Sequence, residues 1–477
     1  MFALRSRRRS LRSALLLAGA LASACVTDPV TGESRFAVMQ WNVKEEQALG
    51  DEAAPNLEQQ FDGALPDAAA QAYLGAVVKE MAGHSVRKDD FPYQFEILNS
   101  SEPNAFALPG GYVYITRGLL VNLESEGEFV AVLGHELGHV EHKHSMLQQN
   151  KTLFAGAVVS AIGVGAELLK LDPDQAKSVS ALAGTGAPLL LLHYSRAQES
   201  EADQRGVYFS HVMGYDPREM KKTFEYFERL ERQTGTTTPS FLRSHPTNEQ
   251  RLKDIDSEIA KTAPEVLAKK SDQFRAPPRS DDRFVKIVKG LQAKAPAHQK
   301  NDQAEQLLAK SPADAKALAQ AAALADEARK LAPDEALFEI TAGEVAYAQG
   351  AGDKGRSHFE KSIALQAKAG VARGHWKPHF YLGALDVDAK RGASAAASLA
   401  QATALFPDNP VAHYYLGRAR ELEGKKQDAA KEYQLVTELA PEDSALAQKS
   451  QERLAALQGP PPNPAAGTKS APPKKGR

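Results

Sequence analysis

The sequence predicts an α+β protein that is mainly helical, with a small sheet in an N-terminal domain and an all-α repeat domain behind it. Apolar residues recur at helical spacing through most of residues 43–232, whereas only residues 91–98 and 112–116 read as strands. Landmark residues that repeat at an offset of 34 near the C-terminus predict the second, helical domain.

Composition limits the classes of function. The 477 residues predict about three structural units at roughly 150 residues each. Hydrophobic residues at 43% are sufficient for sizeable cores, and a net charge of −2 gives no electrostatic reason to expect a nucleic-acid partner. The single cysteine excludes a disulfide framework and a cysteine-rich metal site, so a metal would need histidines and carboxylates.

Residues 1–24 have the features of an export signal. A basic start is followed by an apolar run over 14–24 that is too short to span a bilayer. Small residues precede Cys25 and resemble the lipobox of bacterial lipoproteins, although Ala22 departs from that pattern. We expect lipidation of Cys25, which would anchor the chain to a membrane, and Val26 favours the outer membrane by the same resemblance. The alternative is an ordinary signal peptide that is cut nearby.

The first domain begins with helices and then a sheet. Residues 43–61 and 67–81 show helical periodicity, and Gly63 separates them. Residues 91–98 and 112–116 predict two strands, the second after a Pro-Gly-Gly turn.

Further helices are predicted over 128–145, 195–213 and 219–232. The Ala- and Gly-rich segments 154–169 and 179–192 are shorter than a spanning helix needs, so we expect buried helices or a lid over a cleft, with membrane insertion as the alternative.

A linker and a repeat domain follow. Residues 262–312 turn to Lys, Asp, Ala and Pro, which predicts a linker carrying short helices. Over 313–458, Leu-Gly and Pro landmarks recur 34 residues apart, at Gly383 and Gly417 for example, and 34 is the tetratricopeptide period. Three to four units result; the alternative is a generic Ala-rich helical bundle. Residues 459–477 predict a flexible tail.

The strongest chemical signal is His135-Glu136-Leu137-Gly138-His139. Two imidazoles four residues apart lie on one helix face, where both can reach a single Zn²⁺ at about 2.0–2.1 Å. Glu136 lies beside them and can accept a proton from a water molecule that attacks a peptide bond. This pattern predicts a metal-dependent hydrolase.

A second acidic helix can complete the metal site. Ser195 begins this helix with Gln198 as its capping-box partner, and Glu199 and Asp203 then share a face. That spacing suits Glu199 as a third zinc ligand, with Asp203 holding the ring N–H of a ligating histidine. Compensation of the helix dipole is the alternative reason for an acidic first turn.

These motifs, with Asn104-Ala105-Phe106-Ala107 before Pro109-Gly110-Gly111, resemble the gluzincin zinc metallopeptidases related to HtpX, Oma and the CAAX prenyl endopeptidase. The lipobox and the tetratricopeptide repeats make the resemblance greatest to the BepA-type periplasmic members. It implies a gluzincin-type peptidase domain over 25–261 that holds one Zn²⁺ per chain.

The resemblance also implies roles for residues outside the two helices. His245 would approach the zinc and either steady the oxyanion or occupy the open position at rest. Arg251 would anchor the His245 loop through a salt bridge or would only cover a helix surface. Asn104 to Ala107 would form an edge strand that pairs with an extended substrate.

Solvent exposure is expected for Glu201, His142 and His144, and packing roles for His193 and Tyr194.

The sequence therefore predicts a zinc endopeptidase in the bacterial periplasm, anchored to the outer membrane by the lipid on Cys25. By the same resemblance, its expected clients are protein substrates such as misassembled outer-membrane proteins, and its repeats are expected to bind envelope assembly machinery. A latent zinc site in a chaperone or scaffold is the alternative. A purely structural zinc is disfavoured because three ligands leave a position for water.

Overall fold

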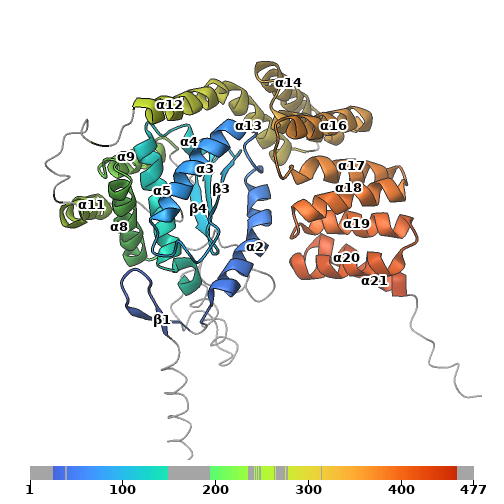
Figure 1. The fold of residues 1–477 in the computed structure, drawn as a ribbon. Helices are drawn as coiled ribbons and strands as arrows, with labels where there is room; N and C mark the ends of the chain where they lie inside the picture. Colours follow the sequence, from blue (N-terminus) through green and yellow to red (C-terminus); the bar gives the residue numbers. More distant parts are fainter. Residues whose placement is uncertain are drawn as a thin grey trace, which may run out of the picture. The chain divides into compact units, whose positions relative to one another are not determined.

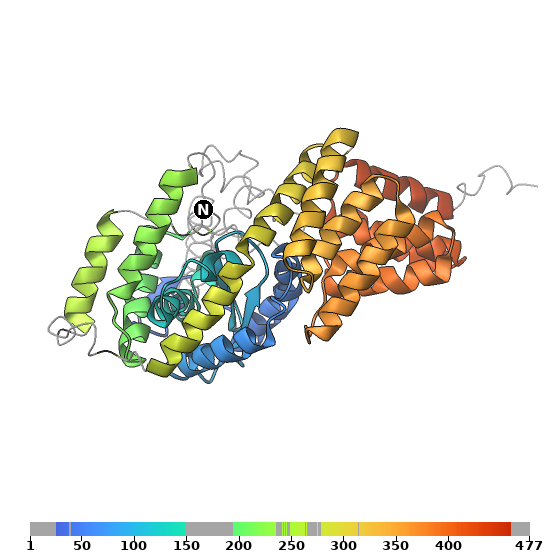
Figure 2. The ribbon, with the colours of Figure 1, turned by 90° about the horizontal axis from the view of Figure 1, so that it is seen from above.

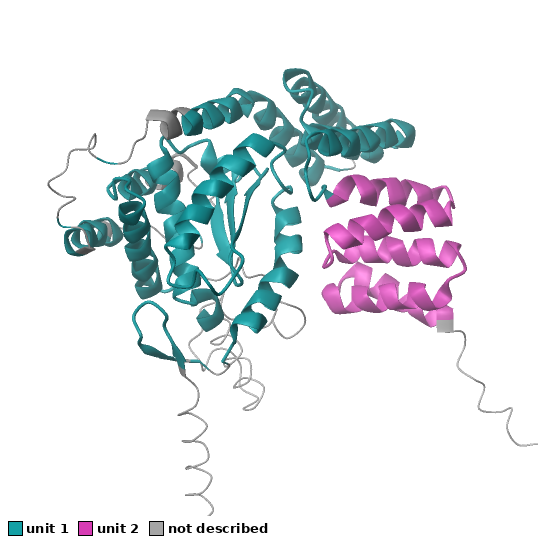
Figure 3. Cartoon of the chain, viewed as in Figure 1, with its two compact units in different colours: residues 1–375 teal, residues 376–477 magenta. Residues whose placement is uncertain are grey.

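The structure is a computed structural model that describes residues 25–37, 40–148, 194–234, 241, 243, 245, 249–262, 264, 274, 278–312 and 314–458. The chain divides into two compact units, residues 1–375 and 376–477 (Figure 3). Helices dominate both units, which confirms the predicted α+β, mainly helical class. No helix in the described ranges combines the length and apolarity that a bilayer crossing requires. Outside these ranges lie the predicted leader, the segments 154–169 and 179–192, and the tail.

A short antiparallel hairpin begins the described chain. Its strands are β1 (Cys25–Thr27) and β2 (Ser34–Phe36). Asp28 closes the turn between them, because its Oδ1 accepts hydrogen bonds from the next backbone N–H groups of the loop. The sequence did not predict this hairpin, since strands of three residues show too little alternation to be recognised.

The two predicted helices follow. α2 (Val43–Gln60) begins with a capping box at Asn42, and α3 (Ala68–Gly83) is capped by the side chain of Asp67. Between them Gly63 has φ +69°, a value that favours glycine. Both helices therefore begin and end where the sequence pattern indicates.

The sheet of the first unit has three described strands. They are β3 (Gln94–Leu98), β4 (Ala105–Leu108) and β5 (Tyr112–Thr116), in the order β3-β5-β4. β3 runs parallel to β5 and β4 antiparallel to it. Gly110 and Gly111, with φ of +81° and +82°, turn the chain between β4 and β5. β4 is thus an edge strand among the strands described.

The core of the first unit forms between this sheet and a central helix (Figure 1). That helix is α5, which contacts β4 and β5 as well as α8 and α9, and all its residues are buried. A helix enclosed in this way is a rigid support for side chains. The helices after β5 are α4 (Arg117–Leu120), α5 (Glu126–Glu141), α8 (Arg196–Val212), α9 (Glu219–Thr234) and α11 (Glu249–Thr262).

The structure differs from the predicted linker over 262–312. Two helices of 16 residues fill most of it, α12 (Pro278–Ala293) and α13 (Ala295–Lys310). α12 packs against α5 (Figure 2), and its Phe284 is fully buried with its ring 6.1 Å from that of Phe129. The sequence pattern favours a linker here because the many charges of the segment obscure a narrow apolar face. Phe284 and Val288 lie one turn apart on that face.

Antiparallel helical hairpins make up the rest of the chain as far as residue 458. In each of three hairpins a glycine of the first helix faces a large side chain 16 residues later: Gly343 faces Phe359, Gly383 faces Leu399 and Gly417 faces Tyr433. This packing supports the predicted tetratricopeptide-like units. The helices are α14 (Ala315–Leu331), α15 (Ala336–Ala348) and α16 (Gly352–Lys368) in the first unit, and α17 (Trp376–Asp388), α18 (Gly392–Leu405), α19 (Pro410–Leu422), α20 (Lys426–Leu439) and α21 (Ala445–Gln458) in the second.

Candidate metal centre

The central helix α5 carries the His-Glu-x-x-His motif in its C-terminal half. Ser125 caps the first turn by accepting a hydrogen bond from the backbone of Glu128. The unbroken helix then sets His135 and His139 one turn apart on one face. These two side chains and Glu136 are each 2% exposed, so the motif lies in a site from which most water is excluded.

The neighbouring helix α8 supplies two carboxylates. It begins with a capping box at Ser195, as predicted, and this start places Glu199 in the first turn and Asp203 one turn later. The two helices approach closely at Gly138, where a Cβ atom would lie 2.8 Å from Cβ of Arg205. The glycine inside the motif therefore lets the two sets of side chains meet.

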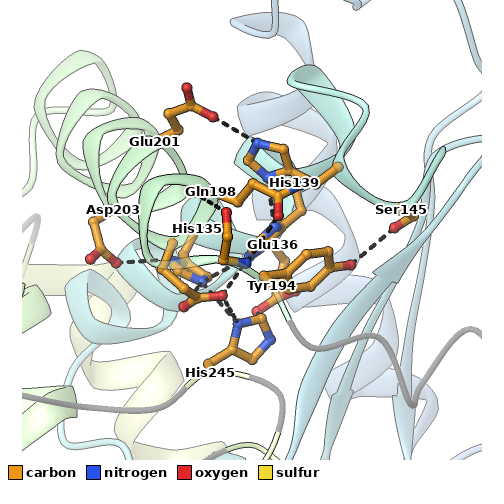
Figure 4. A network of polar contacts seen from close by, with 12 residues as sticks. His135, Glu136, His139, Ser145, Tyr194, Gln198, Glu201, Asp203 and His245 are labelled. Carbon is orange, nitrogen blue, oxygen red and sulfur yellow. Dashed lines mark hydrogen bonds and ion pairs between the residues drawn. The ribbon is translucent and has the colours of Figure 1, made fainter. Parts of the chain in front are cut away.

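Four potential ligands converge between the helices (Figure 4). The Nε2 atoms of His135 and His139 lie 3.1 Å apart, and the carboxylate oxygens of Glu199 lie 3.7 Å from each of them. His245 Nδ1 lies 3.0 Å from Glu199 Oε1 and 3.3 Å from His135 Nε2. One ligand atom from each of the four residues falls within 4.8 Å of the others, so this buried group can hold a metal ion.

A carboxylate and an arginine fix one face of the site. Asp203 Oδ1 lies 2.9 Å from Nδ1 of His135, an arrangement in which Nδ1–H donates and the Nε2 lone pair faces the other ligands. Arg251 pairs with Asp203 at 2.7 Å and with Glu199 at 2.8 Å, and it is 5% exposed. Two roles were considered for Arg251, a salt bridge and the covering of a helix surface. The structure shows a salt bridge, and its partners are Asp203 and Glu199.

Burial and neighbouring charges shift the pKa values of the two site glutamates in opposite directions. Burial raises the pKa of Glu199, but His245 and Arg251 outweigh it and lower that pKa to about 2. For Glu136 burial dominates and raises the pKa above its ordinary value. Burial and the neighbouring imidazoles hold the pKa of His139 well below its usual range, so this ring is neutral and can act as a ligand.

Aromatic rings enclose the imidazoles. Tyr194 stacks on His139 with ring centroids 4.0 Å apart, and its hydroxyl lies 3.0 Å from Ser145 Oγ (Figure 4). Phe241 packs 4.7 Å from the ring of His245. Tyr194 thus has the packing role expected of it, whereas His193 lies outside the described residues.

His142 and His144 are not exposed to solvent, contrary to the expectation. They are 2% and 0% exposed, and His144 Nδ1 lies 2.9 Å from Nδ1 of His139. Glu201 is also paired, with His144 at 2.9 Å. The error came from extending one helix to residue 145: α5 ends at Glu141, and Lys143 has φ +55°, so the chain turns back toward the site.

The hairpin residues Asp28 and Arg35 also reach this region and were missed. Asp28 Oδ2 lies 2.7 Å from Nδ1 of His142, and Arg35 makes two contacts with Glu201. A lone Asp and a lone Arg that lie 107 and 100 residues before His135 give no local signal. Only the folded chain brings them together.

The strand predicted over residues 104–107 is present, but it begins one residue later. Asn104 precedes β4, while Ala105, Phe106 and Ala107 lie in it, next to α5. All four are buried, and Asn104 Oδ1 has no hydrogen-bond partner among the described residues. The backbone of β4 on the side away from β5 is the feature that a substrate strand would use.

The fold and the site together define the class of the metallopeptidases, in which a His-Glu-x-x-His helix faces a carboxylate from a second helix. Residues 68–259 match Peptidase family M48. This part of the chain is therefore similar to an M48 peptidase domain.

Known relatives share this domain. The chain is 26% identical over 271 residues to the beta-barrel assembly-enhancing protease of Escherichia coli (strain K12), which covers 55% of this chain and 53% of that protein. It is 30% identical over 184 residues to the mitochondrial metalloendopeptidase OMA1 of Schizosaccharomyces pombe, covering 39% of this chain and 51% of the relative. The chain thus spans about half the length of these curated relatives.

Among solved structures, the TPR protein YrrB covers 37% of this chain and 92% of its own, with 20% identity and a TM-score of 0.27. A similarity this low adds nothing to the account of the helical hairpins given above.

Proposed function

We propose that this chain is a zinc-dependent endopeptidase that hydrolyses peptide bonds of protein clients. The observation that carries the proposal is the convergence of His135, His139 and Glu199 around one point, with Glu136 beside them. Two imidazoles and a carboxylate form a ligand set of catalytic zinc sites, and one Zn²⁺ per chain fits the group. The matched peptidase family supports the same reaction class.

The residues have separate roles in this proposal. Zinc, when bound, polarises the peptide carbonyl and lowers the pKa of a water molecule toward about 7. Glu136 takes the proton from the attacking water and passes it to the leaving amine; its Oε1 has no hydrogen-bond partner among the described residues. Asp203 and Arg251 hold His135 and Glu199 in place.

His245 lies where a fourth ligand would bind. Its Nδ1 contacts Glu199 at 3.0 Å and its Nε2 lies 3.6 Å from Glu136. We infer a resting arrangement in which His245 occupies the substrate position and moves aside to steady the oxyanion when substrate enters. An extended client then pairs with the edge of β4.

Zinc content and digestion test the proposal. Wild-type protein should contain one zinc per chain and digest an unfolded protein such as casein, and a chelator should stop the digestion. Glu136→Gln should keep the zinc and lose at least about 100-fold in rate, since a general base contributes about 10²–10⁴. Glu52→Gln, an exposed position on α2, is the matched control.

The opposite result favours the chaperone or scaffold alternative. If Glu136→Gln keeps its zinc and also supports envelope integrity as well as wild type, the peptidase proposal fails. Accumulation of an uncut client in that variant supports it. Because His245 can block the resting site, the digestion is also run with His245→Ala.

The setting of this activity is part of the proposal. By analogy with the beta-barrel assembly-enhancing protease, the clients are misassembled outer-membrane proteins in the periplasm, and the helical hairpins bind the assembly machinery. A lipid on Cys25 anchors the chain to the outer membrane. Labelling with palmitate should mark wild type and not Cys25→Ser, and labelling of both would exclude this anchor.

A further inference from the structure

The N-terminal hairpin is connected to the candidate metal centre through a partly buried chain of contacts. Arg35 on β2 donates to both carboxylate oxygens of Glu201, one at 3.0 Å. Glu201 Oε2 lies 2.9 Å from Nε2 of His144, and His144 Nδ1 lies 2.9 Å from Nδ1 of His139. Figure 4 shows two members of this chain of contacts, Glu201 and His139. Four side chains thus lead from the hairpin to a ligand histidine.

The protons along this chain can be assigned from the partners. Glu201 only accepts, so Nε2 of His144 carries the hydrogen that faces it. Arg35 already balances the charge of Glu201, so a neutral His144 suffices, and its Nδ1 is then an acceptor. His139 Nδ1 must therefore donate, which leaves the lone pair of its Nε2 directed at His135 and Glu199, where a metal would bind.

The second ligand histidine is held in an equivalent way. His135 donates from Nδ1 to Asp203, and Asp203 is paired with Arg251. Each motif imidazole is thus oriented by hydrogen bonds that end at an arginine, one from α11 and the other from the hairpin. The two arginines lie 216 positions apart in the sequence, so this equivalence exists only in the folded chain.

We propose that Arg35, Glu201 and His144 are positioning residues for His139, so that the β1–β2 hairpin sets the affinity of the site for its metal. This inference rests on the metal-binding part of the proposed function. Such outer contacts fix the tautomer and the orientation of a ligand ring, and their loss typically weakens metal binding about 10–100-fold.

A second metal ion is the competing explanation for these residues. His142, His144 and Glu201 place potential ligand atoms within 4.8 Å of one another. However, the guanidinium of Arg35 already lies among them, 2.7 Å from Asp28 Oδ2 and paired with Glu201. The positive charge at this position therefore comes from Arg35, and the contacts form a hydrogen-bond chain that ends in an ion pair.

The test measures zinc affinity of the full chain by competition with a chelator. Glu201→Ala and Arg35→Met should bind zinc about 10–100-fold more weakly than wild type. Glu201→Gln keeps an acceptor for His144 and should lose less than Glu201→Ala. Glu33→Ala, an exposed carboxylate of the same hairpin, is the matched control and should bind as wild type does.

Two further readouts separate positioning from folding. The absorption spectrum of the cobalt-substituted protein should change in Glu201→Ala, while thermal unfolding of the metal-free variants should show that each one folds. Wild-type affinity and an unchanged spectrum in Glu201→Ala would overturn the inference. So would two zinc ions in wild type and one in Glu201→Ala. A wild-type chain that binds no zinc would instead refute the proposed function and this inference with it.

Discussion

Arg251 is the residue on which the acidic side of the candidate centre depends. It lies between Glu199 and Asp203, at 2.8 and 2.7 Å, and almost none of it is exposed. Glu199 has a lowered pKa partly because of this arginine, so its carboxylate remains ionised inside the protein. Removing one partner of such a group leaves buried charges without compensation.

We therefore expect Arg251→Met to lower the free energy of unfolding of the metal-free protein by about 3–5 kcal/mol. Arg243→Met is the control, because its side chain is 62% exposed and a surface pair contributes about 0–1 kcal/mol. Denaturant titration measures both variants. Equal stability of the two would show that the buried pairing is not a major contribution.

Among the elements, three of the helical hairpins depend on a glycine in the first helix. A Cβ atom on Gly383 would lie 2.4 Å from Cγ of Leu399, closer than real contacts allow. Gly290 in α12 has open space around its missing side chain and is exposed. The same substitution should therefore have opposite effects at these two helical positions.

Gly383→Ala should destabilise the second unit by about 1–3 kcal/mol through overpacking. Gly290→Ala should instead stabilise the first unit by up to about 1 kcal/mol, because alanine favours a helix. Thermal unfolding measures both, and the loss in Gly383→Ala combined with Leu399→Ala should be smaller than the sum of the two single losses, because the two side chains meet. A loss of equal size at Gly290 would contradict the packing explanation.

A buried carboxylate connects three helices of the first unit. Burial alone would raise the pKa of Glu339, but hydrogen bonds from His358, Lys361 and Arg329 lower it to about 2. These partners come from α16 and α14, while Glu339 lies in α15. Its folded pKa is thus below its ordinary value of 4.5.

A carboxylate whose pKa is lower in the folded protein than in the unfolded chain stabilises the folded state at pH values above the unfolded pKa. This stabilisation is lost as the pH falls toward the folded pKa. We expect the free energy of unfolding to fall between pH 4.5 and about 2, with Glu339 contributing at most about 3 kcal/mol of that change. Glu339→Gln should show a shallower fall, whereas Glu360→Gln, an exposed neighbour on α16, should behave as wild type. Identical pH profiles for all three proteins would rule out this role.

At the scale of the whole molecule, the metal site and most of the hairpin array lie in different compact units. Residues 1–375 contain every candidate ligand, while residues 376–477 contain α17 to α21. A metal that binds only the folded first unit stabilises that unit by mass action. The second unit has no share in this effect.

Calorimetry of the full chain should therefore show two transitions, of which only that of the first unit moves when zinc is removed by a chelator. At free zinc about 1,000-fold above the dissociation constant, the stabilisation should be about 4 kcal/mol. Glu136→Gln, which keeps the ligands, should respond as wild type does. A chelator effect on both transitions, or on neither, would contradict this division.

Much of the element order follows from local patterns. The helices α2, α3, α5 and α8 and the strand β5 were predicted from apolar periodicity and capping residues, which act within a few positions. The end of the helix before Lys143 and the burial of α12 were not predicted. A residue in the left-handed conformation and a narrow apolar face leave little trace in the sequence.

Local spacing alone sets which residues share a helix face, His135 with His139 and Glu199 with Asp203, because helical geometry fixes both relations. The 34-residue offset of the glycines likewise sets the length of one repeat. Only the tertiary structure decided which faces meet. The contacts of Glu199 with His245 and of Arg35 with Glu201 join residues 46 and 166 positions apart. Such pairs form when α5 and α8 pack and the hairpin folds against them, and no local spacing encodes them.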